Sequence, residues 1–361
     1  MLPTTFNPGP SKLSEETHQD IRDAMELGIL EMSHRSSAFN EMSSAAIRDL
    51  RTFFGIPDAY GVYFISSATE AMELTIRNLV WEKSVHFTCG RFSELFAEIS
   101  RANYKHAQEI TAPWGQSPHY DDSKLPIDAE CITITANETS TGVMCSSEDI
   151  VRIRKARPEA MLAVDITSIA GVRSFPIEQA DVWLFSVQKG FGLPSGLGVM
   201  IVSPRALNRS NDLKNDRLNL AGTFSFAELD SFMRRGGQTP CTPNVLNIFL
   251  LGRQLERFNA RGGITAGEKA GRKKATALYE AVNAHPRLTC FVAEPESRSI
   301  SVACIQGMPE DILRLHALAK EEGLHLGKGY AKLKESTVRV ALFPAITDAH
   351  VEAVIRVIGK L

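Results

Sequence analysis

Lys189 is the residue of this sequence whose surroundings point most directly to chemistry. It follows a short apolar run, Val182–Phe185, which predicts a buried strand, and it stands among glycines in the segment Gln-Lys-Gly-Phe-Gly. An ammonium group at the end of a buried strand loses its hydration, which is costly. A lysine that forms a Schiff base with pyridoxal phosphate uses such an amine. The alternative is a surface lysine in a glycine-rich hairpin.

Asp165 favours the cofactor interpretation. It ends a second apolar run, Met161–Asp165, so its carboxylate is expected at the carboxyl end of a strand that precedes the strand of Lys189. A carboxylate that faces the pyridine nitrogen keeps it protonated, and a protonated ring accepts electrons from a carbanion. Alone, an aspartate after a strand is usually a helix cap or a turn residue. Together with Lys189, in this order, it indicates a cofactor site.

Weaker signals follow other predicted strands. A helix is expected to begin at Ser67, and its first amides could hold a phosphate, although a simple serine cap would look the same. Phe92 could stack on a planar ring or fill the core. Ligands bind outside the carboxyl ends of parallel strands, so the following residues are expected to share one edge: Ser67, Phe92, Asn137, Thr139, Asp165 and Lys189.

The alternation of strands and helices predicts the fold. We expect an α/β protein with a large domain, whose mostly parallel sheet is covered by helices on both faces, and a smaller C-terminal α+β domain. The 361 residues suit two domains, predicted as 12–245 for the large pyridoxal-phosphate-binding domain and 246–361 for the small one, after an N-terminal arm at 1–11. We expect residues 204–244 to be irregular and a helix or helix pair at 245–283.

Three cationic or titratable side chains have two interpretations each. Arg339 lies in a predicted strand, where an inward charge is expensive without a partner. Its guanidinium either binds a carboxylate through two parallel hydrogen bonds or faces outward from the strand. His34 and Arg35 lie in a polar loop and are either solvated surface or a clamp for a phosphate or carboxylate.

Composition narrows the class of protein. A net charge of −2 gives no electrostatic case for nucleic acid or membrane as partner, and no apolar run approaches the roughly 20 residues of a membrane span. The start of the chain lacks the regions of a signal peptide, and the six cysteines are scattered without a Cys-x-x-Cys pair. We therefore expect a cytoplasmic enzyme of small molecules, without a metal site.

With these residues laid out, the sequence resembles the phosphoserine aminotransferases, within the class V, fold-type I group of pyridoxal-phosphate enzymes. The likeness covers nearly the whole chain, from Phe6 to Arg339. Its most specific matches are Met32-Ser-His-Arg-Ser36, Asn137-Glu-Thr-x-x-Gly-Val143, Asp165, Ser186-x-Gln-Lys-Gly190 and Gln238-Thr-Pro-x-Thr242.

The resemblance implies a role for each candidate residue and a homodimer with shared active sites. Lys189 would be the Schiff-base lysine, and Asp165 would face the pyridine nitrogen. The other implied roles are ring stacking by Phe92, hydrogen bonds to the cofactor from Thr139 and Gln188, phosphate binding by Ala68 and Thr69 with Gln238 and Thr239 of a second subunit, binding of the substrate α-carboxylate by Arg339, and contact with the substrate phosphate by His34 and Arg35 of the neighbouring subunit.

One departure from the family pattern bears on the substrate. The family commonly has Gly-His-Arg-Ser shortly before the carboxylate arginine, whereas residues 329–334 read Gly-Tyr-Ala-Lys-Leu-Lys. The His–Arg pair that would help to hold a substrate phosphate is absent. Lys328, Lys332 or Lys334 could replace it only as a point charge, without a bidentate fork. A phenylalanine at position 92, where the family usually has tryptophan, is a milder change.

The leading expectation is a pyridoxal-phosphate-dependent aminotransferase of serine biosynthesis, which converts 3-phosphohydroxypyruvate and L-glutamate into O-phospho-L-serine and 2-oxoglutarate. The runner-up is a class V aminotransferase for an unphosphorylated acid, of the serine– or alanine–glyoxylate type. A cysteine desulfurase fits less well, because that group typically has histidine in place of Gln188. A non-catalytic scaffold is disfavoured, since a buried lysine has no purpose there without its cofactor.

Overall fold

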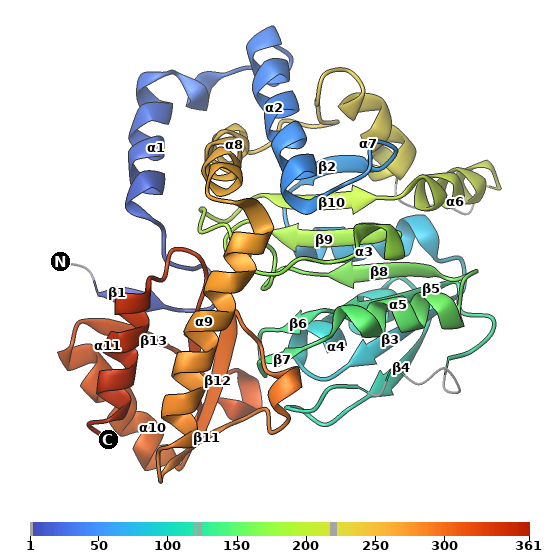
Figure 1. Ribbon diagram of the computed structural model, residues 1–361. Helices are drawn as coiled ribbons and strands as arrows, with labels where there is room; N and C mark the ends of the chain where they lie inside the picture. Colours follow the sequence, from blue (N-terminus) through green and yellow to red (C-terminus); the bar gives the residue numbers. More distant parts are fainter. Residues whose placement is uncertain (1–2, 119, 121–124, 217–221) are drawn as a thin grey trace.

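Two sheets of unequal size organise the chain, as the computed structural model in Figure 1 shows. The structure describes residues 3–118, 120, 125–216 and 222–361. The larger sheet consists of β2 (Gly61–Ile65), β3 (Lys83–Thr88), β4 (His106–Thr111), β5 (Cys131–Thr135), β8 (Met161–Asp165), β9 (Val182–Ser186) and β10 (Gly198–Val202).

The larger sheet is mostly parallel, as predicted. Its strand order is β2-β10-β9-β8-β5-β3-β4, and only β10 runs antiparallel to its neighbours β2 and β9. In register, Thr135 at the end of β5 lies beside Asp165 at the end of β8, and Asp165 lies beside Leu184 of β9. The carboxyl ends of these parallel strands therefore meet at one edge, where ligands of such sheets bind.

Helices cover both faces of this sheet, because alternate strand residues point to opposite sides. Trp183 and Phe185 share a core with the helices of one face, and the Phe185 ring lies 5.6 Å from that of Phe54. Val182 and Leu184 share the core of the other face. The first face is covered by α2 (Ser37–Phe54), α5 (Ser147–Ala156) and α8 (Val245–Ala260); the second by α3 (Ala68–Leu79), α4 (Arg91–Ala102), α6 (Pro204–Asn215) and α7 (Phe226–Met233).

The smaller sheet has the order β1-β13-β14-β12-β11 and lies beside the larger one (Figure 1). Its strands are β1 (Thr4–Phe6), β11 (Leu288–Cys290), β12 (Val302–Gly307), β13 (Leu324–Lys328) and β14 (Thr337–Ala341). It packs with α9 (Gly263–Asn283), α10 (Pro309–Glu321) and α11 (Asp348–Ile358). The α+β character predicted for the C-terminal part is confirmed, and the chain's own N-terminal arm adds β1, parallel to β13.

The expectation that residues 204–244 are irregular is wrong. This segment contains α6 and α7, and each begins at a serine whose hydroxyl caps the helix: Ser203 accepts from the amide of Ala206, and Ser225 from that of Glu228. Few apolar residues mark the helical period in α6, so only its Ser-Pro start was visible in the sequence. The sequence also gave no expectation for α2 or for the edge strand β4.

Further elements complete the fold near the site. α1 (Glu15–Glu26) precedes the polar loop of His34, and a two-stranded sheet, β6 (Asn137–Glu138) and β7 (Val143–Met144), closes the turn after β5. Among the described residues, we find no helix that combines the length and the apolar character needed to cross a membrane.

Candidate active site

Lys189 lies just after β9, at the edge where the parallel strands end. Its Nζ is 3.4 Å from Thr139 Oγ1 and 5.2 Å from the centre of the Phe92 ring. Burial lowers the pKa of Lys189 to about 8; the positive charge of Arg339 acts in the same direction, and Asp165 opposes it. A larger share of this amine is therefore unprotonated near neutral pH than in an exposed lysine, which makes it a better nucleophile.

The N-terminal arm holds the backbone of Lys189 in place. The Ser11 amide donates to the carbonyl of Gln188 at 2.9 Å, and the Ser11 hydroxyl donates to that of Lys189 at 2.8 Å. Gly9 lies so close that a Cβ there would be 2.9 Å from Lys189 Cε. These contacts were missed in the sequence, because they join residues that are far apart in the chain and lie on no shared periodic element.

Asp165 is buried at the end of β8, and its Oδ1 accepts a hydrogen bond from the Thr167 amide at 2.8 Å. Burial raises the pKa of Asp165 to about 6, whereas the hydrogen bonds from Thr167 and the charge of Lys189 oppose the rise. A cation placed against this carboxyl would favour its ionised form. Asp165 is thus suited to face a protonated ring nitrogen.

Several buried polar atoms around these two residues have no hydrogen-bond partner among the described residues. Such atoms are rare in folded proteins unless water or a ligand satisfies them. Three of them belong to neighbours of Asp165 or Lys189 in the sheet or in the sequence, Thr135 Oγ1, Thr167 Oγ1 and Gln188 Oε1, and the fourth is Asn137 Oδ1, on a side chain whose amide donates to Ser168. This set of free donors and acceptors fits a polar, aromatic cofactor such as pyridoxal phosphate.

Arg339 points inward from β14 and is 9% exposed. Its Nε donates to the carbonyl of Lys328 at 2.8 Å, and its Nη1 donates to the carbonyl of Thr139 at 3.1 Å. The guanidinium carbon lies 5.2 Å from the centre of the Tyr330 ring, and burial lowers the pKa of Arg339. A guanidinium has five N–H donors, so these two bonds leave donors for a carboxylate.

The start of α3 lies against the end of β9. The Ala68 amide donates to Ser186 Oγ at 2.7 Å, and the Glu70 amide donates to Ser67 Oγ at 3.1 Å. A Cβ on Gly198 would lie 2.7 Å from the Ser67 backbone, so glycine permits this close approach. Of Ala68 and Thr69, the two residues of α3 predicted to help bind the cofactor phosphate, Ala68 therefore has its amide already bonded within the chain.

The other predicted site residues form a separate group. Arg35 Nη1 donates to Gln238 Oε1 and to the carbonyl of Thr239, both at 2.9 Å, and its Nη2 donates to the carbonyl of Pro240 at 3.3 Å. The neighbouring His34 ring packs edge-on against Phe39. Within the described ranges, no hydrogen bond, ion pair or ring contact joins this group to Lys189. Within a single chain, the site residues thus fall into two groups. The first group surrounds Lys189 and Asp165 and includes Phe92, Thr139, Gln188 and Arg339. The second group contains His34, Arg35, Gln238 and Thr239.

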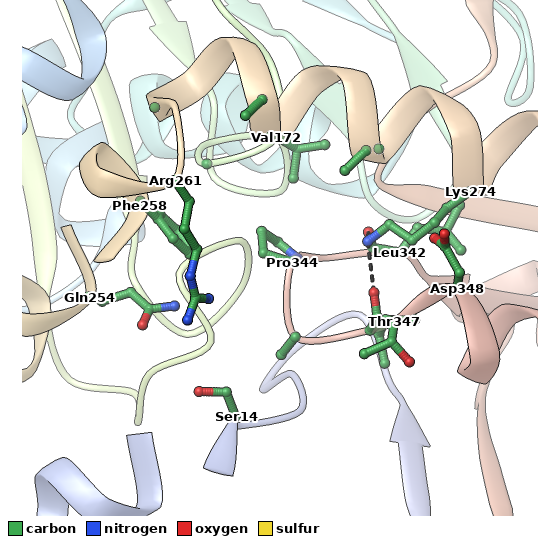
Figure 2. Close-up of a pocket in the computed structure, with 18 of the residues that line it drawn as sticks. Ser14, Val172, Gln254, Phe258, Arg261, Lys274, Leu342, Pro344, Thr347 and Asp348 are labelled. Carbon is green, nitrogen blue, oxygen red and sulfur yellow. Dashed lines mark hydrogen bonds between the residues drawn. The ribbon is translucent and has the colours of Figure 1, made fainter. Parts of the chain in front are cut away.

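The cavity in Figure 2, of about 450 Å³, lies elsewhere. It opens between the start of α1, the junction of α8 and α9, and the loop after β14, with Arg261 at one end and Lys274 and Asp348 at the other. None of the predicted site residues lines it. It borders the loop that follows Lys189 through Gly171, whose Cβ would lie 3.3 Å from the carbonyl of Gly190, and through Phe53 and Phe258, whose rings each lie 5.9 Å from that of Phe191.

The fold and the Lys189–Asp165 pair at its sheet edge define the class of protein: an aminotransferase with the fold-type I architecture. The sequence matches the family described as aminotransferase class-V over residues 5–354, and the chain belongs to this family. Members of this family use pyridoxal phosphate, for which the free polar atoms beside Lys189 are suited.

Curated relatives match the chain over almost its full length. A phosphoserine aminotransferase of Corynebacterium glutamicum (strain R) is 30% identical, over 97% of this chain and 94% of its own length. Those of Nocardioides sp. and Rhodococcus opacus are 29% and 30% identical and cover 97% and 96% of this chain and 93% and 91% of their own lengths.

Solved structures agree with this assignment. A phosphoserine aminotransferase from Cytophaga hutchinsonii superimposes with a TM-score of 0.95 at 32% identity, covering 99% of this chain and 98% of that one. A phosphoserine aminotransferase from Bacillus circulans subsp. alkalophilus has a TM-score of 0.82 at 22% identity, covering 98% of this chain and 97% of that one. The second likeness shows the shared fold alone.

Proposed function

We propose that this protein transfers the amino group of L-glutamate to 3-phosphohydroxypyruvate, with pyridoxal phosphate as cofactor, and releases O-phospho-L-serine and 2-oxoglutarate in serine biosynthesis. The observation that carries this proposal is the similarity to phosphoserine aminotransferases along 96–97% of the chain. It is supported by a desolvated lysine and a buried carboxylate at the sheet edge where the chemistry requires them.

In this proposal, the first group of site residues holds the cofactor. Lys189 would hold it through Nζ, Asp165 would interact with its ring nitrogen, and Phe92 would pack against its ring. Thr139 and Gln188 supply hydrogen bonds, and Thr69 with the start of α3 receives its phosphate, since the amide of Ala68 is already bonded to Ser186. Pyridoxal phosphate would supply an electron sink for the carbanion that forms when an amino acid loses its Cα proton.

The chain's own residues would carry out the steps around that carbanion. Arg339 binds and orients the substrate α-carboxylate with the donors that Lys328 and Thr139 leave free. Lys189 Nζ would serve as the general base that takes the Cα proton of the substrate and moves it to the C4′ carbon of the cofactor. Its pKa, lowered to about 8 by burial, suits both halves of this transfer near neutral pH.

The substrate phosphate and part of the cofactor phosphate would be bound across a homodimer interface. His34 and Arg35 of one subunit would face the substrate phosphate in the other, and Gln238 and Thr239 would reach the cofactor phosphate. The bonds from Arg35 to the 238–240 segment support this grouping, because one guanidinium holds both elements together. Arg35 would therefore also position the segment that carries Gln238 and Thr239.

We also propose the cellular setting and the division into domains. Six free cysteines fit a reducing compartment, which supports the cytoplasm.

The large and small domains would meet near residue 261, after α8, instead of at residue 245, because α8 packs against α2 beside the larger sheet. The N-terminal arm would belong to the small domain through β1.

A panel of half-reactions tests the substrate. Phosphoserine, serine, alanine and glutamate are added singly to the enzyme loaded with cofactor, and the loss of the cofactor's visible absorption band is followed. We expect phosphoserine and glutamate to react fastest. A clear preference for alanine or serine would instead assign the enzyme to the unphosphorylated class, as the missing His–Arg pair at 330–331 would allow.

Complementation tests the shared site. Lys189→Ala and Arg35→Ala subunits are each expected to be inactive or nearly so, because each homodimer lacks one component in every site. A verified heterodimer has one site with both residues and should regain up to about half of the activity per site pair. Heterodimers that stay inactive would rule out the contribution of Arg35 across the interface.

A further inference from the structure

Glu138 is a fully buried carboxylate to which the proposed function gives no role. It lies at 0% exposure in β6, next to Thr139. Its two oxygens accept hydrogen bonds from the amides and hydroxyls of Ser93 and Ser140 and from the Phe92 amide, at distances of 2.7 to 3.3 Å. All of these donors are neutral. A buried charge held only by neutral donors is expensive, so its placement calls for an explanation.

These bonds make Glu138 the cap of α4. The residue before the helix is Gly90, which has no side chain to satisfy the first free amides. Glu138 accepts the amides of Phe92 and Ser93, and the hydroxyl of Ser140 accepts that of Arg91 at 3.0 Å. The negative charge also complements the positive end of the helix dipole.

The atoms around this cap are closely packed. A Cβ on Gly90 would lie 2.5 Å from Glu138 Cγ and 2.6 Å from Ser140 Oγ, so the glycine is required for Glu138 to approach. The Ser93 hydroxyl, which donates to Glu138, also accepts from the Cys89 amide at 3.0 Å. The end of β3 and the first turn of α4 are thus fastened to the turn at residues 138–140.

The same turn contacts Lys189, Arg339 and the first residues of α4, which include Phe92. Thr139 Oγ1 is 3.4 Å from Lys189 Nζ, and the carbonyl of Thr139 accepts from Arg339 Nη1 at 3.1 Å. Phe92, whose amide Glu138 holds, has its ring centre 5.2 Å from Lys189 Nζ. One turn therefore connects the ring that stacks on the cofactor, the lysine that binds it, and the arginine that binds the substrate.

We propose that Glu138 is a positioning residue of the transaminase site: it fixes the start of α4 against the turn at 138–140, and so sets Phe92 and Thr139 relative to Lys189 and Arg339. This inference rests on the proposed function. A helix cap alone would need only a local serine or aspartate, as Ser146 provides before α5 and Ser203 before α6. Glu138 instead comes from another element, one that itself touches Lys189 and Arg339.

Glu138→Gln tests this proposal, because glutamine keeps the shape but offers one acceptor oxygen in place of two. The NH2 group of glutamine then faces either the amides of Phe92 and Ser93, which share Oε2, or the amide of Ser140, which donates to Oε1, so the link between α4 and the turn at 138–140 loses an acceptor on one side. We expect kcat/KM to fall roughly 10- to 100-fold, as for the loss of charge-assisted hydrogen bonds. We also expect weaker binding of pyridoxal phosphate and a smaller visible circular dichroism signal from the bound cofactor. These two readouts need no turnover, so they remain valid if the substrate assignment fails.

Glu130→Gln is the matched control. Glu130 also accepts three backbone amides, those of Trp81, Glu82 and Lys83 at 2.7, 2.8 and 2.9 Å, but at the opposite end of β3. The Glu130→Gln variant should have a lower melting temperature, as Glu138→Gln does. Its kcat/KM and its circular dichroism signal should stay within about twofold of wild type. If both variants lose only thermal stability, Glu138 is merely a cap and the proposal is wrong.

A double-mutant cycle with Phe92→Ala separates positioning from other effects. If Glu138 acts through Phe92, the double variant should be little worse than Phe92→Ala alone in kcat/KM and cofactor affinity. Fully additive losses would overturn the proposed route. Should Glu138→Gln fail to fold, Ser93→Ala and Ser140→Ala each remove a hydroxyl donor to Glu138 and should lower the same two quantities about two- to fivefold; unchanged values in both would contradict the proposal.

Discussion

Two lysines of this protein, the half-buried Lys189 and the buried Lys274, show how one type of side chain is used in two ways. Burial lowers the pKa of both to about 8. Lys274 donates to the carbonyls of Leu342, Phe343 and Ile346 at 2.7, 2.9 and 2.9 Å, in the wall of the cavity in Figure 2. Among the residues that the structure describes, Lys189 Nζ has one hydrogen-bond partner, Thr139 Oγ1 at 3.4 Å.

The difference lies in the hydrogen-bond partners of the two ammonium groups. An ammonium has three donors, and in Lys274 each finds a carbonyl, so the charged form is stabilised and ties the loop after β14 to α9. Lys189 has lost water without gaining such partners, which leaves its amine free to react. A lowered pKa therefore does not distinguish the two lysines, whereas the lack of hydrogen-bond partners favours Lys189 as the one proposed to bind the cofactor.

The largest effect is expected from the removal of the Lys189 side chain. Lys189→Ala should abolish the cofactor's visible absorption band and lower transamination by at least about 10²- to 10⁴-fold, because the nucleophile and the proton carrier are both removed. Absorption spectra and single-turnover assays measure these effects. Lys274→Met, the counterpart, should keep the band. If Lys189→Ala stayed active while Lys274→Met lost the band, the assignment of the two lysines would be reversed.

Asp165 is a second difference between the two lysines, since Lys274 has no buried carboxylate with a comparable role. Asp165→Asn should lower kcat about 10- to 100-fold, because the ring nitrogen loses its charged partner. Lys189 should still bind the cofactor, so the visible band should persist. Steady-state rates and spectra of the same sample check this. An unchanged kcat would remove Asp165 from the site.

Much of the fold and of the first group of site residues could be predicted from the sequence. The strand at 161–165 was predicted with the bounds that the structure has, and the apolar run 182–185 lies within β9 (Val182–Ser186), because short apolar runs before polar residues mark buried parallel strands. The convergence of their carboxyl ends at one edge then followed from topology. The family resemblance added the roles of the residues, and these roles stay predictions.

The rest depends on contacts between distant segments. No local pattern shows that Ser11 holds the backbone of Lys189, that Glu138 caps α4, or that Arg35 holds residues 238–240. Glu138 was part of a quoted motif, but its neighbours Asn137 and Thr139 offered more obvious chemistry. A glycine as the N-cap of α4 was the available signal, since it leaves amides that another element must satisfy.

For the free energy of unfolding, the mutation of Lys274 should have a larger effect than the mutation of Lys189. Lys274→Met leaves three carbonyls without their donor, and we expect a loss of about 2–3 kcal/mol in the free energy of unfolding. Its kcat and KM should stay within about twofold of wild type. Denaturant unfolding and steady-state kinetics measure both. Lys189→Ala should lose less stability, as it breaks only one weak hydrogen bond.

The smallest effect, and the one that sharpens the comparison most, is the pH dependence of cofactor uptake by the apoprotein. Only the unprotonated amine of Lys189 can attack the cofactor, so the uptake rate should rise roughly tenfold per pH unit below the pKa and level off above it. With the pKa of Lys189 lowered to about 8, the rate should level off near pH 8, well below the pH expected for an exposed lysine.

The Lys274→Met variant should give the same pH profile of cofactor uptake, because the amine of Lys274 takes no part in it. Asp165→Asn should level off at lower pH, since the carboxylate that favours the ammonium form is gone. A rate that climbs steadily to pH 10 in all three proteins would mean that Lys189 is not desolvated, and the contrast with Lys274 would then rest on hydrogen bonds alone.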